Sequence, residues 1–202
     1  MKRIIILFLI GLSVYGCSST KDLLPSPVDT YLGSRLAVKD TVIIISNKIN
    51  SNYVLDLFKE RSLVSINNNT LDNSIISNDP SYVEEYWNLM NKRYRNYKTD
   101  ETWVQTSFWT QDDFKNPQIK FMKEKDFPKP TAYNEFMSEK SSEVTVFAFS
   151  DPVFYQNKQY ALFAKSETTT KKQFIKPISI VIMKAEKGKW IYVKEINDGN
   201  YY

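Results

Sequence analysis

The chain has 202 residues and a formal net charge of +4 at neutral pH, with one cysteine, five glycines and no histidine. The missing histidine excludes Ser-His-Asp and Cys-His catalysis and histidine-ligated metals, and neither GxGxxG nor GxxxxGK[ST] is present to bind phosphate. The positive charge is weak and scattered, so it does not indicate a nucleic-acid partner.

The chain opens with two basic residues and an apolar run. Lys2 and Arg3 precede residues 4–14, which are all apolar or small. A bilayer span needs about 20 apolar residues. The shorter run is typical of a signal peptide rather than of a transmembrane helix. We therefore assign residues 1–16 to a signal peptide.

The only cysteine follows this run directly, in Val14-Tyr15-Gly16-Cys17. This stretch resembles the bacterial lipobox, in which a cysteine is lipidated and becomes the first residue after cleavage. The resemblance implies a diacylglyceryl thioether and an N-acyl chain such as palmitate on Cys17, which would anchor the chain to a membrane. Ser18 after the cysteine favours the outer membrane, with the inner membrane as the alternative.

The next segment, residues 17–33, is polar and contains Pro25 and Pro27. Proline-rich polar segments form extended, semi-rigid spacers. We expect a tether here. Residues 34–202 are then predicted to form one domain, because they are numerous enough for a hydrophobic core of their own.

The sequence predicts one short strand and two short helices outside the C-terminal third. The β-branched run TVIIIS at 41–46 predicts a buried strand, and residues 51–62 are typical of a short helix. A weaker helical pattern occupies residues 131–142, directly after Pro130.

The clearest helix signal lies at residues 80–97. Asp79 and Pro80 suit its start, and Ser81 with Glu84 resembles a capping box. Apolar and aromatic residues recur at helical spacing and predict a buried face, namely Val83, Tyr86, Trp87, Met90, Tyr94 and Tyr97.

The C-terminal third is rich in strand patterns separated by turn residues. These predicted strands are residues 143–150, 152–155, 159–166, 177–186 and 189–196. Short turns make neighbouring strands antiparallel. The sequence therefore predicts a single α+β domain, with an antiparallel β-meander covered on one face by the amphipathic helix at 80–97.

This region also carries a resemblance to known proteins. Its features are Ser150-x-Pro152-x-Phe154, then Tyr160-Ala161-Leu162, then Gly188-Lys189-Trp190. Over about residues 147–196 the chain resembles a family of small lipoproteins of Bacteroidota-type bacteria that has no established activity. The resemblance implies a lipoprotein and brings no catalytic residue with it.

Three residues are candidates for a binding or modification site. Trp103 and Trp109 lie in a less regular segment and are candidates for an exposed surface that stacks on sugars or anchors a protein. Core packing is the alternative for both. Asp40-Thr41-Val42 resembles a motif that these bacteria O-glycosylate at the threonine, and the start of a strand is the alternative.

Paired acids are the remaining candidates for chemistry. Asp112-Asp113 and Glu84-Glu85 are adjacent, and adjacent side chains point apart, so neither pair forms a two-carboxylate site alone. There is no Asp-x-Asp-x-Asp-Gly loop for calcium. We assign no catalytic residue, metal or cofactor from the sequence.

The sequence thus favours a lipid-anchored, non-catalytic envelope module that binds a protein or glycan. One alternative is a carboxylate-dependent envelope hydrolase that acts on glycans. Another is an inhibitor or immunity-type lipoprotein that uses the same surfaces without chemistry.

Overall fold

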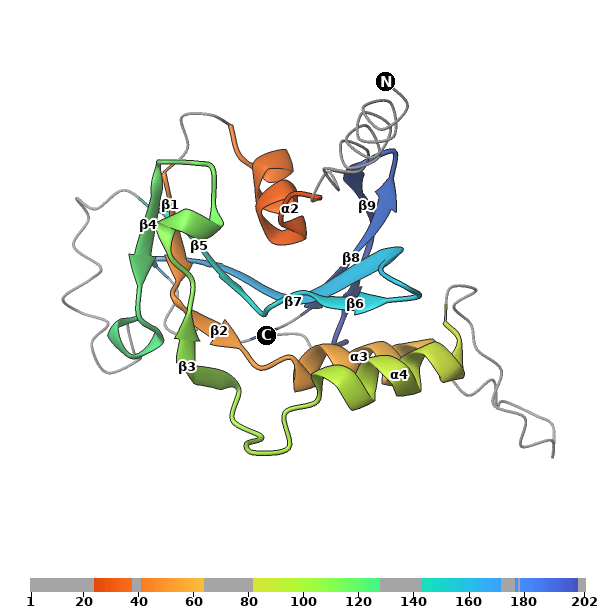
Figure 1. Cartoon of the computed structure of the whole chain (residues 1–202). Coiled ribbons are helices and arrows are strands. Elements are labelled where there is room, and N and C mark those ends of the chain that lie inside the picture. Colours follow the sequence, from red (N-terminus) through yellow and green to blue (C-terminus); the bar gives the residue numbers. More distant parts are fainter. Residues whose placement is uncertain are drawn as a thin grey trace, which may run out of the picture.

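A mixed β-sheet with helices on both faces organises the domain (Figure 1). The computed structural model describes residues 24–37, 41–63, 82–127, 143–171, 177 and 179–199. The sheet strands are β1 (Val42–Ile45), β4 (Ile119–Met122), β5 (Thr145–Phe149), β6 (Val153–Tyr155), β7 (Tyr160–Thr169), β8 (Ser179–Glu186) and β9 (Lys189–Asn197). The helices are α2 (Pro27–Arg35), α3 (Asn52–Ser62) and α4 (Glu84–Tyr94), with short 3-10 turns η1 (Gln111–Asp113) and η2 (Glu124–Asp126). The predicted single α+β domain is confirmed.

The strand order is β4-β1-β5-β7-β8-β9, and β6 pairs with β7. The C-terminal strands β5 to β9 pair antiparallel to one another, which confirms the five predicted C-terminal strands. β1 enters between β4 and β5 and runs parallel to both. β2 (Asn47–Ile49) and β3 (Trp103–Phe108) form a separate antiparallel pair.

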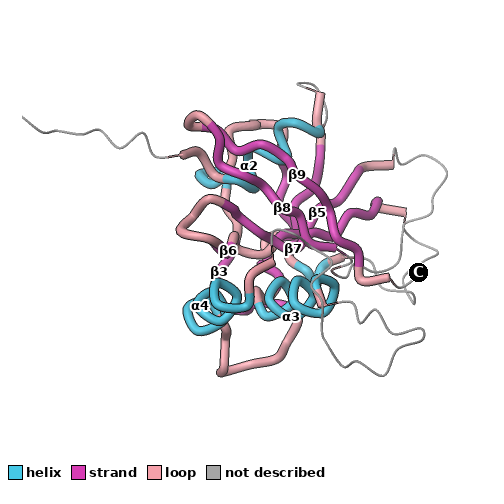
Figure 2. Tube along the Cα trace, turned by 90° about the vertical axis from the view of Figure 1, so that its right-hand side faces the viewer, coloured by secondary structure: helices cyan, strands magenta, loops and turns pink. Residues whose placement is uncertain are grey.

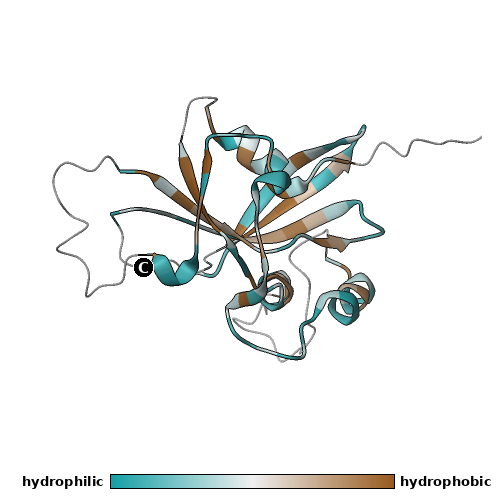
Figure 3. Cartoon of the chain, turned by 60° about the vertical axis from the view of Figure 1, so that its left-hand side comes forward, coloured by the Kyte–Doolittle hydropathy of each residue, from teal (hydrophilic) through white to brown (hydrophobic). Residues whose placement is uncertain are grey.

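Both faces of the sheet are buried, because successive strand residues join different core layers. On β5, Phe147 and Phe149 pack on the side of α2, whereas Val146 and Ala148 pack on the side of α3 and α4. Figure 2 shows the same arrangement from the side, with α3 and α4 below the sheet. In Figure 3 the apolar residues concentrate along the strands and on the inward sides of the helices. The domain therefore has three layers. The predicted arrangement, a sheet with a helix on one face, has two.

The extra layer corrects the predicted tether. The prediction of a spacer is wrong for residues 27–33, which belong to α2, and residues 17–23 lie outside the described part of the chain. Ser26 caps the helix by accepting a hydrogen bond from the Asp29 amide at 3.4 Å, and Pro27 suits its first turn. Tyr31 is buried in the core. The domain therefore begins before residue 34.

α4 confirms the core of the predicted helix and corrects its start. Trp87 and Met90 are buried, as the helical spacing predicts. The helix begins at Glu84, and Val83 precedes it without a side-chain cap, whereas Ser81 of the predicted capping box lies outside the described residues. Tyr97 lies beyond the helix and is exposed, in contrast to the predicted buried face. The predicted helix at 131–142 lies outside the described residues.

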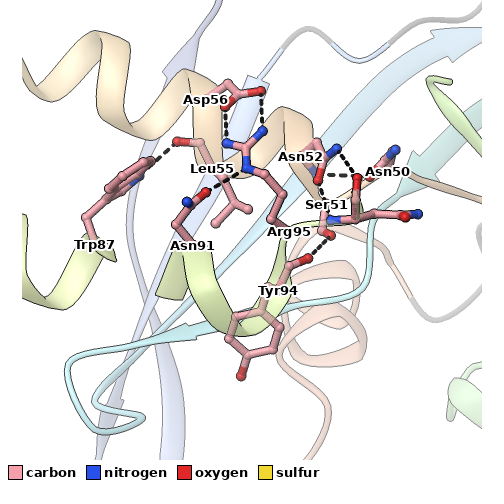
Figure 4. Close-up of polar contacts among 10 residues, drawn as sticks. Asn50, Ser51, Asn52, Leu55, Asp56, Trp87, Asn91, Tyr94 and Arg95 are labelled. Carbon is pink, nitrogen blue, oxygen red and sulfur yellow. Dashed lines mark hydrogen bonds and ion pairs between the residues drawn. The ribbon is translucent and has the colours of Figure 1, made fainter. Parts of the chain in front are cut away.

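Polar contacts fasten α3 to α4 (Figure 4). The Trp87 indole N–H donates to the carbonyl of Leu55 at 3.1 Å, and the Arg95 guanidinium binds both carboxylate oxygens of Asp56. Two further bonds join Ser51 to the Tyr94 carbonyl at 3.1 Å and Asn52 to the Asn96 carbonyl at 2.9 Å. Partly buried carbonyls at and just after the C-terminal end of α4 are satisfied in this way, which gives the network a structural role.

Candidate functional site

A buried lysine lies beneath α2, at the centre of a charged cluster. Lys165 is on β7 and only 5% exposed. Its Nζ lies 2.9 Å from Glu195 Oε1 on β9 and 3.1 Å from Glu167 Oε2 on its own strand. The two carboxylates satisfy the charge that burial would otherwise leave without a partner.

The protonation state of Lys165 suits a fixed positive charge. Burial alone lowers the pKa of Lys165, but the hydrogen bond to Glu195 and the neighbouring negative charges raise that pKa overall. A lysine that acts as a nucleophile needs a lowered pKa. Lys165 therefore remains an ammonium at neutral pH and ties β7 to β9.

Tyr31 of α2 covers this cluster. Its ring centroid lies 6.0 Å from Lys165 Nζ, and its hydroxyl is buried without a hydrogen bond of normal geometry to any described residue. The hydroxyl of Ser179, on β8, is also buried without a hydrogen bond to any described residue. Burial raises the pKa of Tyr31, and the charge of Lys165 offsets part of that rise. The neutral phenol is therefore the stable form in the folded state.

We expect this raised pKa to make the fold sensitive to alkali. An unfolded tyrosine ionises near pH 10. Above that pH the folded state binds more protons than the unfolded state, so the free energy of unfolding falls as the pH rises. Tyr31→Phe should reduce this fall by up to about 1.4 kcal/mol per pH unit. At pH 7 it should leave stability unchanged or raise it by about 1 kcal/mol, because it removes a buried hydroxyl that makes no hydrogen bond of normal geometry with the described residues.

Urea unfolding at pH 7 and at several pH values between about 9 and 11 measures both effects. Tyr97→Phe is the matched control, since Tyr97 is exposed and should change neither value. An alkaline slope that is identical in wild type and Tyr31→Phe would contradict the argument.

Beside Tyr31 the edge strand carries exposed residues that, with Arg35, we call the β9 patch, namely Ile191, Tyr192 and Val193. Tyr192 lies on the α2 side, whereas Ile191, one residue earlier on the strand, points to the other face of the sheet. The three β9 residues are consecutive, apolar and 46%, 44% and 43% exposed in chain order. Arg35 is also exposed, and its guanidinium carbon lies 5.7 Å from the centroid of the Tyr192 ring. β9 ends the strand order of the sheet, so this patch lies along an edge.

The β9 patch is held in place before any partner arrives. The Tyr192 ring packs against Tyr31 at a centroid distance of 6.2 Å, and Arg35 also lies over the Tyr31 ring at 5.3 Å. β9 carries a bulge at Val193, because Tyr192 pairs with Met183 while Lys194 pairs with Ile182. A bulge interrupts regular strand pairing and redirects side chains. The patch therefore offers side chains to a partner rather than a regular strand edge.

The residues predicted as a binding surface take different places. Trp109 is buried, its indole N–H donates to the Phe149 carbonyl at 3.1 Å, and Lys48 lies 4.4 Å from its ring centroid. The prediction of an exposed Trp109 is therefore wrong, and core packing applies. Trp103 is half-buried on β3 and packs against the core on the α3 side. Thr41 is exposed directly before β1, and Cys17 lies outside the described residues.

The two acidic pairs lie in different layers. Glu84 and Glu85 open α4, whereas η1 carries Asp112 and Asp113 next to the core on the α2 side. The hydrogen bond from Tyr82, and then that from Lys59, lower the pKa of Glu84. A general acid needs a raised pKa. Glu84 is therefore a paired surface carboxylate, and the adjacent acids do not meet across one site.

The described residues contain no group of three or more His, Cys, Asp or Glu arranged to hold a metal ion. Within the same residues, no helix has the length and apolar character needed to cross a bilayer.

Sequence reasoning missed the Lys165 cluster and the β9 patch. Ala161 and Phe163 point into the core from β7, and Lys165 is the next residue on the same face of that strand. A lysine at a position that alternation predicts to be buried could have indicated a buried charge. For the patch the signal was weaker, because the exposure of Ile191 and Val193 depends on where the sheet ends.

Comparison with known proteins gave no match: no family model, no curated protein and no solved structure is significantly similar to this chain.

Proposed function

We propose that the chain is a lipid-anchored protein of the bacterial outer membrane that acts as a non-catalytic module, binding an envelope protein through the β9 patch. The lipid anchor rests on the lipobox-like sequence that ends at Cys17. The observation that carries the binding role is the run of three consecutive exposed apolar residues on β9, of which Tyr192 packs against Tyr31 of α2.

Several features of the patch suit a protein partner. Tyrosine and arginine are enriched among residues that dominate binding energies. Tyr192 is already packed against Tyr31, so less side-chain freedom is lost when a partner covers it. The other large exposed apolar residues, such as Leu89, Tyr97 and Phe108, are dispersed over α4, a turn and β3, and such single residues are normal on surfaces.

The patch chemistry also defines the class of partner. Its apolar centre calls for apolar side chains, and Arg35 at its rim calls for a carboxylate or a backbone carbonyl. A glycan would need several hydrogen-bonding groups around an exposed ring face. The β9 patch has one aromatic ring and one exposed charged group, so a protein suits it better.

Site-specific photo-crosslinking in membranes of the native host tests this proposal. A photo-reactive residue in place of Val193 should yield a discrete covalent adduct with another protein, which mass spectrometry identifies. Adding Tyr192→Ala should reduce that adduct by about tenfold or more, as expected for a central binding residue. The matched control places the same reagent at Leu89, which is 58% exposed on α4 and should give no such adduct.

Two results would contradict the proposal. One is the absence of an adduct at position 193 when the protein is correctly located. The other is the same set of adducts from positions 193 and 89, which would indicate random encounters. An adduct at twice the mass of the chain would replace the envelope partner with a second copy of this protein.

A further inference from the structure

One end of the sheet carries a group of lysines on two adjacent turns. The β6–β7 turn contains Lys158, and the β8–β9 turn contains Lys187, with Lys189 directly after it. All three side chains are exposed. The Ala185 amide donates to the Gln159 carbonyl at 2.8 Å, which joins the two turns.

We call this region the lysine end, and its positive charge is only partly compensated. Its fourth lysine, Lys184, lies 2.9 Å from Glu186 in an exposed ion pair. Four lysines therefore face one carboxylate within the two turns and their flanking strand residues.

The backbone of these turns is unusual for lysine. Lys158 and Lys187 have φ values of +67° and +48°, in the left-handed region. Glycine, asparagine and aspartate are the residues that favour this conformation. Lysine thus occupies two turn tips at which local conformation alone would select a different residue.

The polypeptide enters the domain at this same end. The Trp190 indole N–H, at the start of β9, donates to the Pro25 carbonyl at 2.8 Å. Cys17 precedes Pro25 by eight residues in the sequence. Whatever their conformation, eight residues span at most about 29 Å. A lipid on Cys17 would therefore keep the lysine end close to the surface of the bilayer.

We propose that the lysine end docks onto the bilayer surface by binding anionic phospholipid headgroups. This inference rests on the lipid anchor of the proposed function and adds how the anchored domain is oriented. Lysines near an anionic bilayer are attracted within a screening distance of about 8 Å at physiological salt. The connection to Cys17 keeps them within reach of the surface, so they meet it often and a few lysines suffice. Val193 lies farther along β9, beyond Lys189 and Trp190, and stays available to a partner.

Amine acetylation of the lipidated protein in vesicles tests the docking. The full mature protein is purified from membranes and reconstituted into vesicles of phosphatidylcholine alone, or with phosphatidylglycerol added. Brief treatment with an amine-reactive ester, followed by mass spectrometry, gives a rate for each lysine. Lys158, Lys184, Lys187 and Lys189 should react about threefold or more slowly in anionic vesicles, because contact and the negative surface both protect an ammonium. Lys92 of α4 and Lys125 of η2 are exposed internal controls that should keep their rates.

A variant makes the result specific. Changing Lys158, Lys187 and Lys189 together to glutamate should abolish the protection of Lys184 in anionic vesicles, and 0.5 M salt should do the same in the wild type. These are exposed positions, so the fold should remain intact. Equal rates in the two kinds of vesicle, or equal protection in both, would overturn the docking. A chain with unmodified Cys17 that does not stay with the vesicles would overturn the lipid anchor as well, so the two failures are distinguishable.

Discussion

Trp87→Ala should lower the free energy of unfolding by about 3–5 kcal/mol, as for other large-to-small changes in a core. Trp87 is buried between α4 and α3, and its indole donates to the Leu55 carbonyl. The change leaves a cavity and removes the indole N–H that donates to that carbonyl. Domains of this size are stable by roughly 5–15 kcal/mol, so the loss is a large part of the total.

Urea denaturation followed by circular dichroism measures this loss. Leu89→Ala is the matched control on the same helix, because Leu89 is exposed and its truncation should change stability by no more than about 0.5 kcal/mol. If both variants unfold at the wild-type midpoint, Trp87 does not support the core between α3 and α4.

Cys17→Ser should move the protein from the membrane fraction to the soluble fraction, or leave it as an unprocessed precursor. Serine cannot form the thioether, so the acyl chains that hold the protein in the bilayer would be absent. Several acyl chains bind a bilayer firmly because each buried methylene contributes about 0.8 kcal/mol.

Cell fractionation with a high-salt wash, together with mass spectrometry of the N-terminal peptide, measures the change. Ser18→Ala keeps the cysteine and should remain in the membrane fraction with its acyl mass. A wild-type protein with an unmodified Cys17 thiol would refute the lipoprotein proposal.

Most of the C-terminal sheet could be predicted because its sequence pattern is local. Runs such as TVFAF and SIVIM are rich in β-branched and aromatic residues, and turn residues separate them. The same runs are apolar at nearly every position, which is typical of strands buried on both faces. The strand sequences therefore already indicated that both faces of the sheet are covered, although the prediction placed a helix on one face only.

α2 shows why the rest was harder. Pro25 and Pro27 favour a spacer by composition, yet Ser26 as N-cap, Pro27 in the first turn and Arg35 in the last turn are also the signals of a helix. Burial of Tyr31 and Leu32 against the sheet decides between the two interpretations, and burial is a property of the folded domain.

The candidate sites were less predictable than the fold. The Lys165 cluster joins residues of β7 and β9, and the β9 patch joins that strand to Arg35, more than 150 positions earlier in the sequence. Trp109 was misplaced for a related reason. Its segment lacks a regular period, but its indole reaches the Phe149 carbonyl on β5.

The position of β1 inside the sheet has a consequence for how the chain acquires its structure. Val42 lies beside Ile119, and Ile43 lies beside Val146, so both neighbours of this early strand come much later in the chain. Domains dominated by such distant pairings fold in milliseconds to seconds, more slowly than those with local contacts. A chain that emerges with its N-terminus first has no partner for β1 until β4 has followed, and the second partner, β5, comes later still. The sheet therefore cannot be completed until most of the chain has been made, and an incompletely folded polypeptide is the form that can be threaded across a membrane.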